Sequence, residues 1–300
     1  MLIGTRLGMA PWWKLLDMSQ RTNTQYLRNN QYQDASNLNA RIQIHQRFST
    51  NPANWFRWVF DHLDISRVAN ILDLGCGPGL LWTNNLDRLQ PDHHIYLSDF
   101  SLGMLSEAYQ NIHNADINFS YIVIDAKAIP LPSESLSIVI ANHMLYHVPN
   151  RPLTIKEIHR ILKPGGKLVA ATNGENHMAQ IDGLLSRLDP PLGAQSDYAF
   201  GISEFTLENG NAQLTGSFVR VKRILFPGNL EVTEAEPLLA YLHSMITATN
   251  ENTNPQGWIR IRQMIDQEIS MKGSFHISKS TGLFIAEKSM IVDHTGQHDD

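Results

Sequence analysis

The stretch that decides the fold is Ile71-Leu72-Asp73-Leu74-Gly75-Cys76-Gly77-Pro78-Gly79-Leu80. Its first four residues predict a short apolar strand, three glycines at alternate positions predict a turn, and an apolar helix follows from Leu80. Glycine tolerates positive φ and lets a ligand approach the backbone without meeting a Cβ. The start of the next helix directs unpaired N–H groups at whatever lies over the turn. We therefore expect a nucleotide-binding turn here; the alternative is a turn that serves only tight strand–helix packing.

The spacing of the glycines separates two kinds of nucleotide site. A dinucleotide-binding turn reads G-x-G-x-x-G and needs a glycine at position 80, where this chain has Leu80. The pattern is instead D-x-G-x-G-x-G. It resembles motif I of the class I S-adenosylmethionine-dependent methyltransferases, whose loop holds the methionine half of the cofactor. The resemblance implies that the cofactor contacts Asp73, Gly75, Cys76, Gly77 and Gly79.

Composition excludes several classes of partner. A net charge of −5 disfavours nucleic acid, which usually requires a basic surface. The apolar N-terminal segment is too interrupted to reach the ~20 residues of a membrane span. The one cysteine, Cys76, suits a reducing compartment. We expect a cytoplasmic protein with no membrane or nucleic-acid partner, in which Trp12 and Trp13 are candidates for a contact between identical subunits.

From residue 69 onward, strands and helices alternate in the way that predicts a parallel sheet. We expect strands at 71–74, 95–98, 121–124, 136–141, 167–172, 218–226 and 282–287, with helices at 80–89, 102–112 and 154–162 between the first five. The last of these helices should end at Lys163-Pro164-Gly165-Gly166. The predicted fold is α/β: a doubly wound, mostly parallel, seven-stranded sheet of the Rossmann-like methyltransferase type.

Helical segments flank this core on both sides. Leu38, Ile42, His45 and Phe48 fall on one face of a helix with Ser36 as its N-cap, and a second helix is expected at 55–63. Further helices are expected at 180–188, 205–214, 234–246 and 258–271. We therefore divide the chain into an N-terminal helical lid (1–64), a cofactor-binding core (65–174), and the remainder of the sheet with a helical substrate cap (175–300).

Acidic residues follow the second and third predicted strands, where ligands bind in open α/β sheets. Asp99 can accept both hydroxyls of an adenosine ribose, although a solvated loop acid is the alternative. Phe100 and Met104 offer flat or polarisable surfaces to an adenine. The resemblance also implies that Asp125 accepts from the adenine amino group and that Ala126 contacts its ring.

The fourth strand ends at Asn142-His143-Met144-Leu145-Tyr146-His147. His143 and His147 have the i, i+4 spacing of zinc-binding helices, but Met144 stands where such motifs have Glu, and no third ligand follows. We therefore expect no metal. Nucleic-acid amino-methyltransferases commonly carry, at this point, an acid or Asn followed by Pro-Pro and an aromatic residue, and this chain does not. It also lacks the acids that a magnesium-dependent catechol enzyme would have after the fourth strand. The resemblance places Asn142 at the cofactor.

Together with Arg160–Leu168, these motifs make residues 65–172 similar to the small-molecule, ubiquinone/menaquinone-methylase-like (type 11) methyltransferases. The phrases Asn-Leu-Asn-Ala-Arg (37–41) and Phe-Thr-Leu-Glu-Asn-Gly (205–210) resemble a bacterial branch, several members of which tailor natural products. Ser137 departs from the acid that many relatives carry early in the fourth strand. The resemblance implies methyl transfer from S-adenosylmethionine to O, N or C of a small, aromatic or apolar acceptor, leaving S-adenosylhomocysteine.

Several roles are expected at this site. His143 is the first candidate base and also a candidate substrate contact, and His147 is the second candidate base; the alternative for both is a packing or lining role. Arg47 is a candidate for holding the cofactor carboxylate, and Tyr26 and Tyr32 for contacting substrate. Two other functions stay open: a cofactor-binding partner subunit without catalysis, and a nicotinamide dehydrogenase. The sequence does not name the acceptor.

Overall fold

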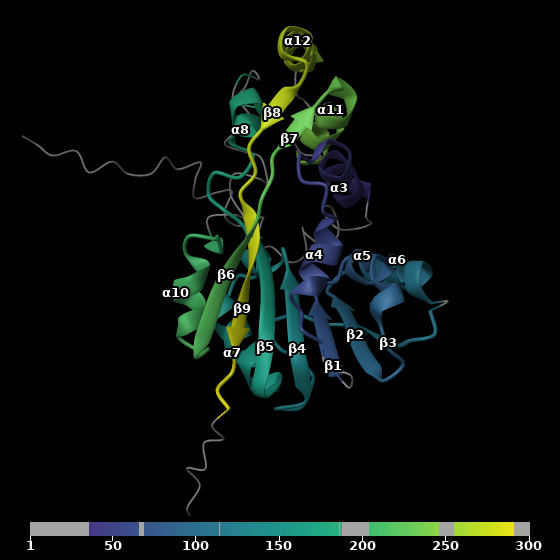
Figure 1. The fold of residues 1–300 in the computed structure, drawn as a ribbon, viewed down its shortest axis with the longest axis vertical. Coiled ribbons are helices and arrows are strands. Elements are labelled where there is room, and N and C mark those ends of the chain that lie inside the picture. The colour runs from purple at the N-terminus through teal and green to yellow at the C-terminus, as the bar shows by residue number, and fades with distance from the viewer. Residues whose placement is uncertain are drawn as a thin grey trace, which may run out of the picture.

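The computed structural model describes residues 36–65, 69–113, 115–185, 187, 204–245 and 255–290. Its main sheet contains seven strands: β1 (Ala69–Leu74), β2 (His93–Asp99), β3 (Asn118–Val123), β4 (Leu136–Asn142), β5 (Leu162–Asn173), β6 (Arg220–Phe226) and β9 (Thr281–Glu287). Their order is β3-β2-β1-β4-β5-β9-β6 (Figure 1). The first five are parallel, whereas β9 runs antiparallel to both β5 and β6. The predicted doubly wound, mostly parallel seven-stranded sheet is confirmed.

Helices cover both faces of this sheet because successive strand residues point to opposite sides and both sides are apolar. On one face, Ile71 packs in a core with α4 (Trp55–Asp61), α5 (Leu80–Thr83) and α6 (Leu102–Ile112). On the other face, Leu72 belongs to a core with α7 (Arg151–Ile161) and α10 (Gly210–Thr215). Because the glycine turn directly follows β1, it lies at the carboxyl edge of the parallel strands.

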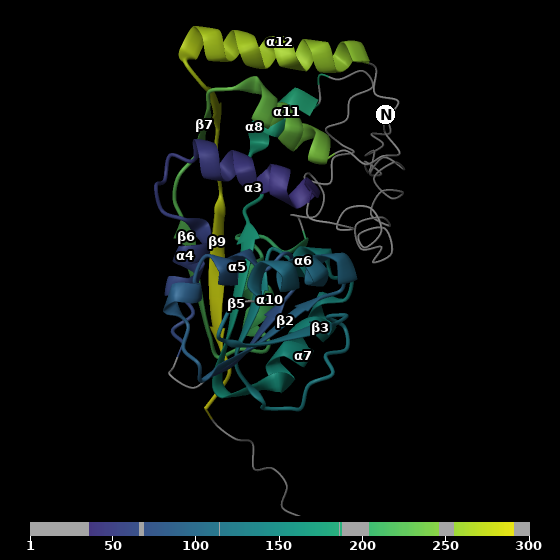
Figure 2. The same cartoon turned by 90° about the vertical axis from the view of Figure 1, so that its right-hand side faces the viewer.

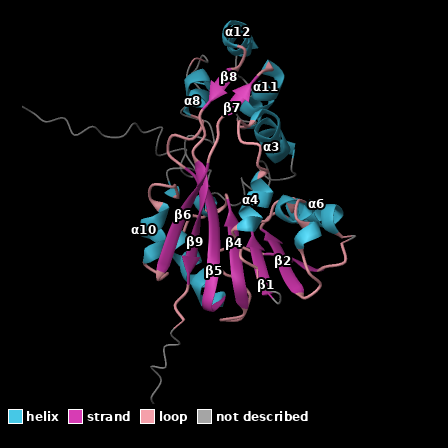
Figure 3. Cartoon of the chain, in the orientation of Figure 1, coloured by secondary structure: helices cyan, strands magenta, loops and turns pink. Residues whose placement is uncertain are grey.

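A second layer, which we call the cap, lies above that carboxyl edge (Figures 2 and 3). It consists of α3 (Ser36–Phe48), α8 (Ala179–Leu185), α11 (Ala235–Ser244), α12 (Pro255–Lys272) and the antiparallel pair β7 (Leu230–Val232) and β8 (Phe275–Ile277). A separate hydrophobic core holds the cap together, and Ile44 and Phe48 of α3 are part of it. Helix α3 therefore packs with elements nearly 200 residues away in the sequence.

Two details differ from the sequence prediction. Strands β7 and β8 were not predicted. The helix expected at 80–89 is instead α5 followed by the short 3₁₀ helix η2 (Leu86–Arg88). The Asn84 and Asn85 amides donate to the carbonyls of Leu80 (2.8 Å) and Leu81 (2.7 Å), and such side-chain bonds compete with helix continuation. Within the described ranges, no helix has both the length and the apolar character needed to cross a membrane.

Candidate cofactor and acceptor site

The glycine turn between β1 and α5 has a geometry that side chains would disturb. Gly75, Gly77 and Gly79 all have positive φ, at 77°, 54° and 76°. The N–H groups of Gly75 and Cys76 both donate to the Ser98 carbonyl at 2.8 Å, which ties the turn to β2. A Cβ on Gly75 would lie 3.0 Å from the Cβ of Met144. Among the described residues, a Cβ on Gly77 would meet only Leu38 Cδ2, at 3.5 Å. The backbone at Gly77 is therefore open to a ligand.

Gly79 has a different role from its neighbours. It is the N-cap of α5, and a Cβ there would lie 2.6 Å from Ile112 Cδ1 and 3.3 Å from Ala108 Cβ of α6. It does not line the cavity described below. Gly79 thus allows α5 to pack closely against α6, so its contribution to the site is indirect.

Two buried carboxylates lie beneath the turn. Asp73 Oδ2 accepts from the Trp82 indole N–H at 2.8 Å, while its Oδ1 has no hydrogen-bond partner among the described residues. Burial raises the pKa of Asp73 to about 7, and the Trp82 bond opposes that rise. Asp99 Oδ2 accepts from the Gly77 N–H at 3.0 Å and its Oδ1 from the Ser101 N–H at 2.9 Å. Burial raises the Asp99 pKa to about 6 despite these bonds.

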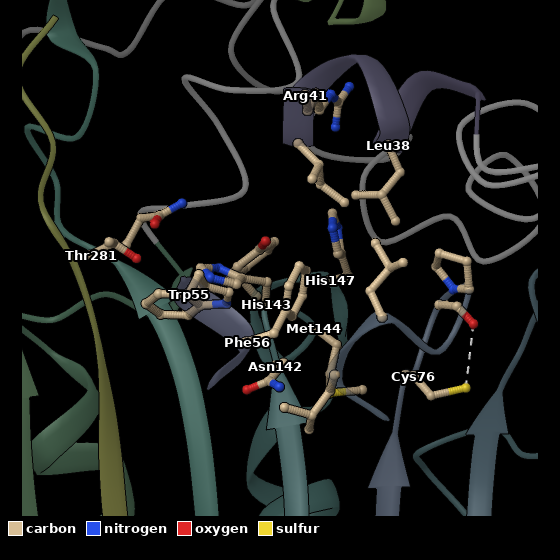
Figure 4. Close-up of a pocket in the computed structure, with 18 of the residues that line it drawn as sticks. Leu38, Arg41, Trp55, Phe56, Cys76, Asn142, His143, Met144, His147 and Thr281 are labelled. Carbon is tan, nitrogen blue, oxygen red and sulfur yellow. Dashed lines mark hydrogen bonds between the residues drawn. The ribbon is translucent and has the colours of Figure 1, made fainter. Parts of the chain in front are cut away.

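A cavity of about 780 Å³ lies between the carboxyl edge of the sheet and the cap (Figure 4). Ten of the predicted cofactor residues line it: Asp73, Gly75, Cys76, Gly77, Asp99, Phe100, Met104, Asp125, Ala126 and Asn142. Asp125 is half-exposed, and its side chain pairs with Lys127 at 3.1 Å. The structure thus brings the ends of β1, β2 and β4, and the residues after β3, to one wall.

The residues after β4 extend into the middle of this cavity. His143 has a φ of 52°, and its N–H donates to the Ala171 carbonyl of β5 at 3.0 Å. Its ring centroid lies 5.4 Å from that of Trp55, and burial lowers its pKa to about 4, so the ring is neutral near pH 7. His147 also lines the cavity. The described residues contain no group of three or more His, Cys, Asp or Glu that could hold a metal ion.

The structure places Arg47 away from its predicted position. Its guanidinium pairs with Glu234 at 2.6 Å, and the residue does not line the cavity. The inner face of α3 instead presents Leu38, Arg41 and His45 to the cavity, at helical spacings of three and four. Arg41 donates from Nε to the Ser244 hydroxyl (3.1 Å) and from Nη2 to the Ser244 carbonyl (2.5 Å). Tyr26 and Tyr32 lie outside the described residues.

Several lining residues of the cap were not predicted. His177 follows β5, Tyr241 lies on α11, and Lys279 precedes β9; each lines the same cavity. No motif surrounds them in the sequence. The sequence could have indicated Arg41 as a lining residue, because it lies three residues after Leu38, next to the helical face formed by Leu38, Ile42 and His45.

The sheet order, with a glycine turn after β1 and acids at the next two strand ends, is that of the class I S-adenosylmethionine-dependent methyltransferases. Residues 72–170 match the model of a methyltransferase domain, Methyltransf_11. Over residues 72–170, the chain is therefore similar to a class I methyltransferase domain of this family.

Curated relatives match over the same region. A demethylmenaquinone methyltransferase of Listeria welshimeri is 29% identical over 115 residues, which are 38% of this chain and 49% of that protein. A ubiquinone/menaquinone biosynthesis C-methyltransferase of Pseudoalteromonas translucida is 26% identical over 117 residues, 38% and 47% of the two chains. The match thus spans about half the length of these relatives.

Solved structures share the fold over more of the chain. A putative methyltransferase from Bacillus halodurans aligns with a TM-score of 0.55 at 15% identity, covering 79% of this chain and all of that one. The [4+2]-cyclase SpnF aligns with a TM-score of 0.55 at 16% identity, covering 90% and 97%. At these identities the likeness concerns the fold alone.

Proposed function

We propose that this protein transfers the methyl group of S-adenosylmethionine to a small aromatic or apolar acceptor. One observation carries the proposal: a single cavity has the glycine turn and buried carboxylates at one end and aromatic side chains at the other. Trp55 and Phe226 line the second end, and their ring centroids lie 5.2 Å apart. A volume of about 780 Å³ is within the ordinary range of ligand sites.

The residues present fit the cofactor. The open backbone at Gly77 provides room beside the turn. Asp99 lines the cavity next to it, which supports a role as acceptor of two ribose hydroxyls. Phe100 and Met104 provide surfaces for the adenine, with Asp125 and Ala126 as its edge contacts. A sulfonium and an ammonium group suit a wall with three carboxylates, and a bound cation favours the ionised forms of Asp73 and Asp99.

When bound, S-adenosylmethionine supplies an electrophilic methyl carbon, so the protein has mainly to align the acceptor and exclude water. Helix α3 covers the glycine turn, since a Cβ on Gly77 would lie 3.5 Å from Leu38 Cδ2 of that helix. His143 lies between the two ends of the cavity, and its neutral ring can take a proton from an acceptor O–H or N–H. His147 is the second candidate base. The acceptor, we propose, is a secondary metabolite met in the cytoplasm.

Methyl transfer itself tests this proposal. The protein is incubated with S-adenosylmethionine labelled on the methyl carbon and a low-molecular-weight metabolite extract, and labelled products are separated. We expect label in at least one small molecule. If His143 is the base, His143→Ala should slow transfer by roughly 10²–10⁴-fold. His113→Ala, which alters an exposed histidine stacked on Tyr109, should transfer at the normal rate.

The same experiment separates the alternatives. A protein that binds S-adenosylhomocysteine but labels nothing across a broad panel would be a cofactor-binding partner subunit, and the proposal would fail. Full turnover of His143→Ala across pH 6–9 would remove His143 from the role of base while leaving methyl transfer intact. The likeness to a [4+2]-cyclase makes this assay necessary, because fold alone does not decide the reaction.

A further inference from the structure

Charged groups are divided between the two ends of the cavity. The carboxylates that line it are those of Asp73, Asp99 and Asp125, which belong to β1, β2 and the segment after β3. Basic side chains also line it. Lys127 lies in the segment after β3, and the others come from α3, from the segments after β4 and β5, and from the β8–β9 loop: Arg41, His45, His143, His147, His177 and Lys279. Lys127 pairs with Asp125. On the cap side of the cavity, the described lining residues are therefore basic and include no acid.

Two permanent cations line that side: Arg41, whose guanidinium bonds to Ser244, and Lys279. Lys279 is partly buried, and its ammonium lies 5.3 Å from the ring centroid of Phe226. Its backbone N–H donates to Asn229 Oδ1 at 3.1 Å, which anchors the β8–β9 loop. Among the described residues its ammonium forms no salt bridge with a carboxylate. Burial lowers its pKa, which shows that the charged form is poorly solvated. An anion in the cavity would offset that cost.

Two histidines stand beside this cation. His177 Nδ1 accepts from the Ser280 N–H at 3.0 Å, so a neutral ring carries its proton on Nε2. The ring of His45 stacks at 6.2 Å from that of His177. Burial, and then the charge of Lys279, lowers the pKa of His45 to about 3. Lys279 therefore supplies the positive charge beside these two histidines, and their neutral imidazoles can supply N–H donors.

These three side chains lie on the acceptor side of the sheet. Lys279 precedes β9, and the order β1-β4-β5-β9 places that strand three spacings, or about 14 Å, from the strand of the glycine turn. A continuous series of ring contacts joins Lys279 to the middle of the cavity: Phe226 lies under its ammonium, Trp55 contacts Phe226 at 5.2 Å, and His143 contacts Trp55 at 5.4 Å.

We propose that Lys279, assisted by His45 and His177, is an anion subsite that binds a carboxylate of the methyl acceptor. The acceptor is then an aromatic carboxylic acid, whose ring lies along Trp55 and Phe226 and whose reacting atom lies near His143. This inference rests on the proposed function and names the substrate class of the same site. The carboxylate could come either from the acceptor or from the methionine half of the cofactor, and the experiment distinguishes the two.

The test uses the full chain saturated with S-adenosylhomocysteine and two matched pairs of probes: benzoate with benzamide, and 2-naphthoate with 2-naphthamide. Binding is measured by ligand-observed NMR titration. We expect each acid to bind at least tenfold tighter than its amide. Lys279→Met should abolish that preference, and Lys279→Arg should retain it. Lys222→Met, an exposed lysine of β6 outside the cavity, is the matched control and should leave the preference unchanged.

Three results would overturn the inference: equal binding of acids and amides, an unchanged preference in Lys279→Met, or a tenfold loss of S-adenosylhomocysteine affinity in Lys279→Met. The last would assign the carboxylate to the cofactor. Failure of the proposed function would give a different pair of results. The probe titration would still show the acid preference and its loss in Lys279→Met, but the methyl-labelling assay would label no metabolite.

Discussion

Asp99→Asn should weaken cofactor binding strongly. In the free protein the Asp99 carboxylate accepts from the Gly77 and Ser101 N–H groups, at 3.0 and 2.9 Å, and each oxygen retains lone pairs for ribose hydroxyls. Hydrogen bonds to a charged group contribute about 1.5–3 kcal/mol each. Asparagine has one acceptor oxygen and no charge, so we expect a loss of about 3 kcal/mol, or roughly 100-fold in Kd.

The pH dependence of binding gives a second readout of the same group. Burial raises the Asp99 pKa from 3.8 to about 6, so in the free protein the carboxyl is protonated below that pH and ionised above it. Only the ionised form accepts with both oxygens. The Asp99 contribution to S-adenosylhomocysteine affinity should therefore fall by up to about tenfold for each pH unit below 6 and be constant between pH 7 and 8. The variant should lack the part of this dependence that Asp99 contributes.

Isothermal titration with S-adenosylhomocysteine at pH 5.0, 6.0 and 7.5 measures both effects. Asp92→Asn is the matched control, since Asp92 lies exposed just before β2, at the opposite end of the strand from Asp99. Thermal unfolding of each variant confirms that it is folded. An unchanged Kd in Asp99→Asn at pH 7.5 would show that Asp99 is not the ribose ligand and would refute the reasoning.

Two further predictions concern the turn that supports the site. Gly79→Ala should destabilise the protein by about 1–3 kcal/mol in urea unfolding, because alanine disfavours a φ of 76° and its methyl would crowd Ile112. The control is Gly183→Ala on α8, where an added Cβ would have no described neighbour within 4 Å. This variant should change stability by less than about 1 kcal/mol. Equal stabilities of the two variants would contradict the packing role of Gly79. Trp82→Phe should remove the indole bond to Asp73 and cost about 1–3 kcal/mol at pH 8. Since that bond favours ionised Asp73, whose pKa is about 7, the loss should shrink at pH 5, and a pH-independent loss would contradict this account.

The sheet could be predicted because each of its strands carries a local signal. The β1 turn, the strand-end acids and the break at Pro164 lie within a few residues of the elements they define, and all seven strands were expected. Strands β7 and β8 were missed because each has three residues and pairs with a partner more than 40 residues away. The end of α5 was missed because it depends on the Asn84 and Asn85 side chains bonding to particular carbonyls.

The site divides in the same way. Residues of the cofactor wall follow strands, and their positions in the sequence indicated where they would gather. The cap wall depends on tertiary packing: His45, His177 and Lys279 come from α3, from the segment after β5 and from the β8–β9 loop, and nothing in their local sequence links them. Arg47 was predicted as a cofactor contact, and Arg41 was not considered, although helical spacing from Leu38 places Arg41 on the same face. The pairing of Arg47 with Glu234 across the cap leaves Arg41 as the arginine of α3 that reaches the cavity.

The central claim is that the turn Gly75–Gly79 and the acids beside it bind S-adenosylmethionine rather than a dinucleotide. The most direct measurement is isothermal titration of the full chain with S-adenosylhomocysteine and, separately, with NADH. We predict one site per chain for S-adenosylhomocysteine and no binding of NADH at the same concentrations. Tight binding of NADH that Asp73→Ala leaves unaffected, with none of S-adenosylhomocysteine, would contradict the claim.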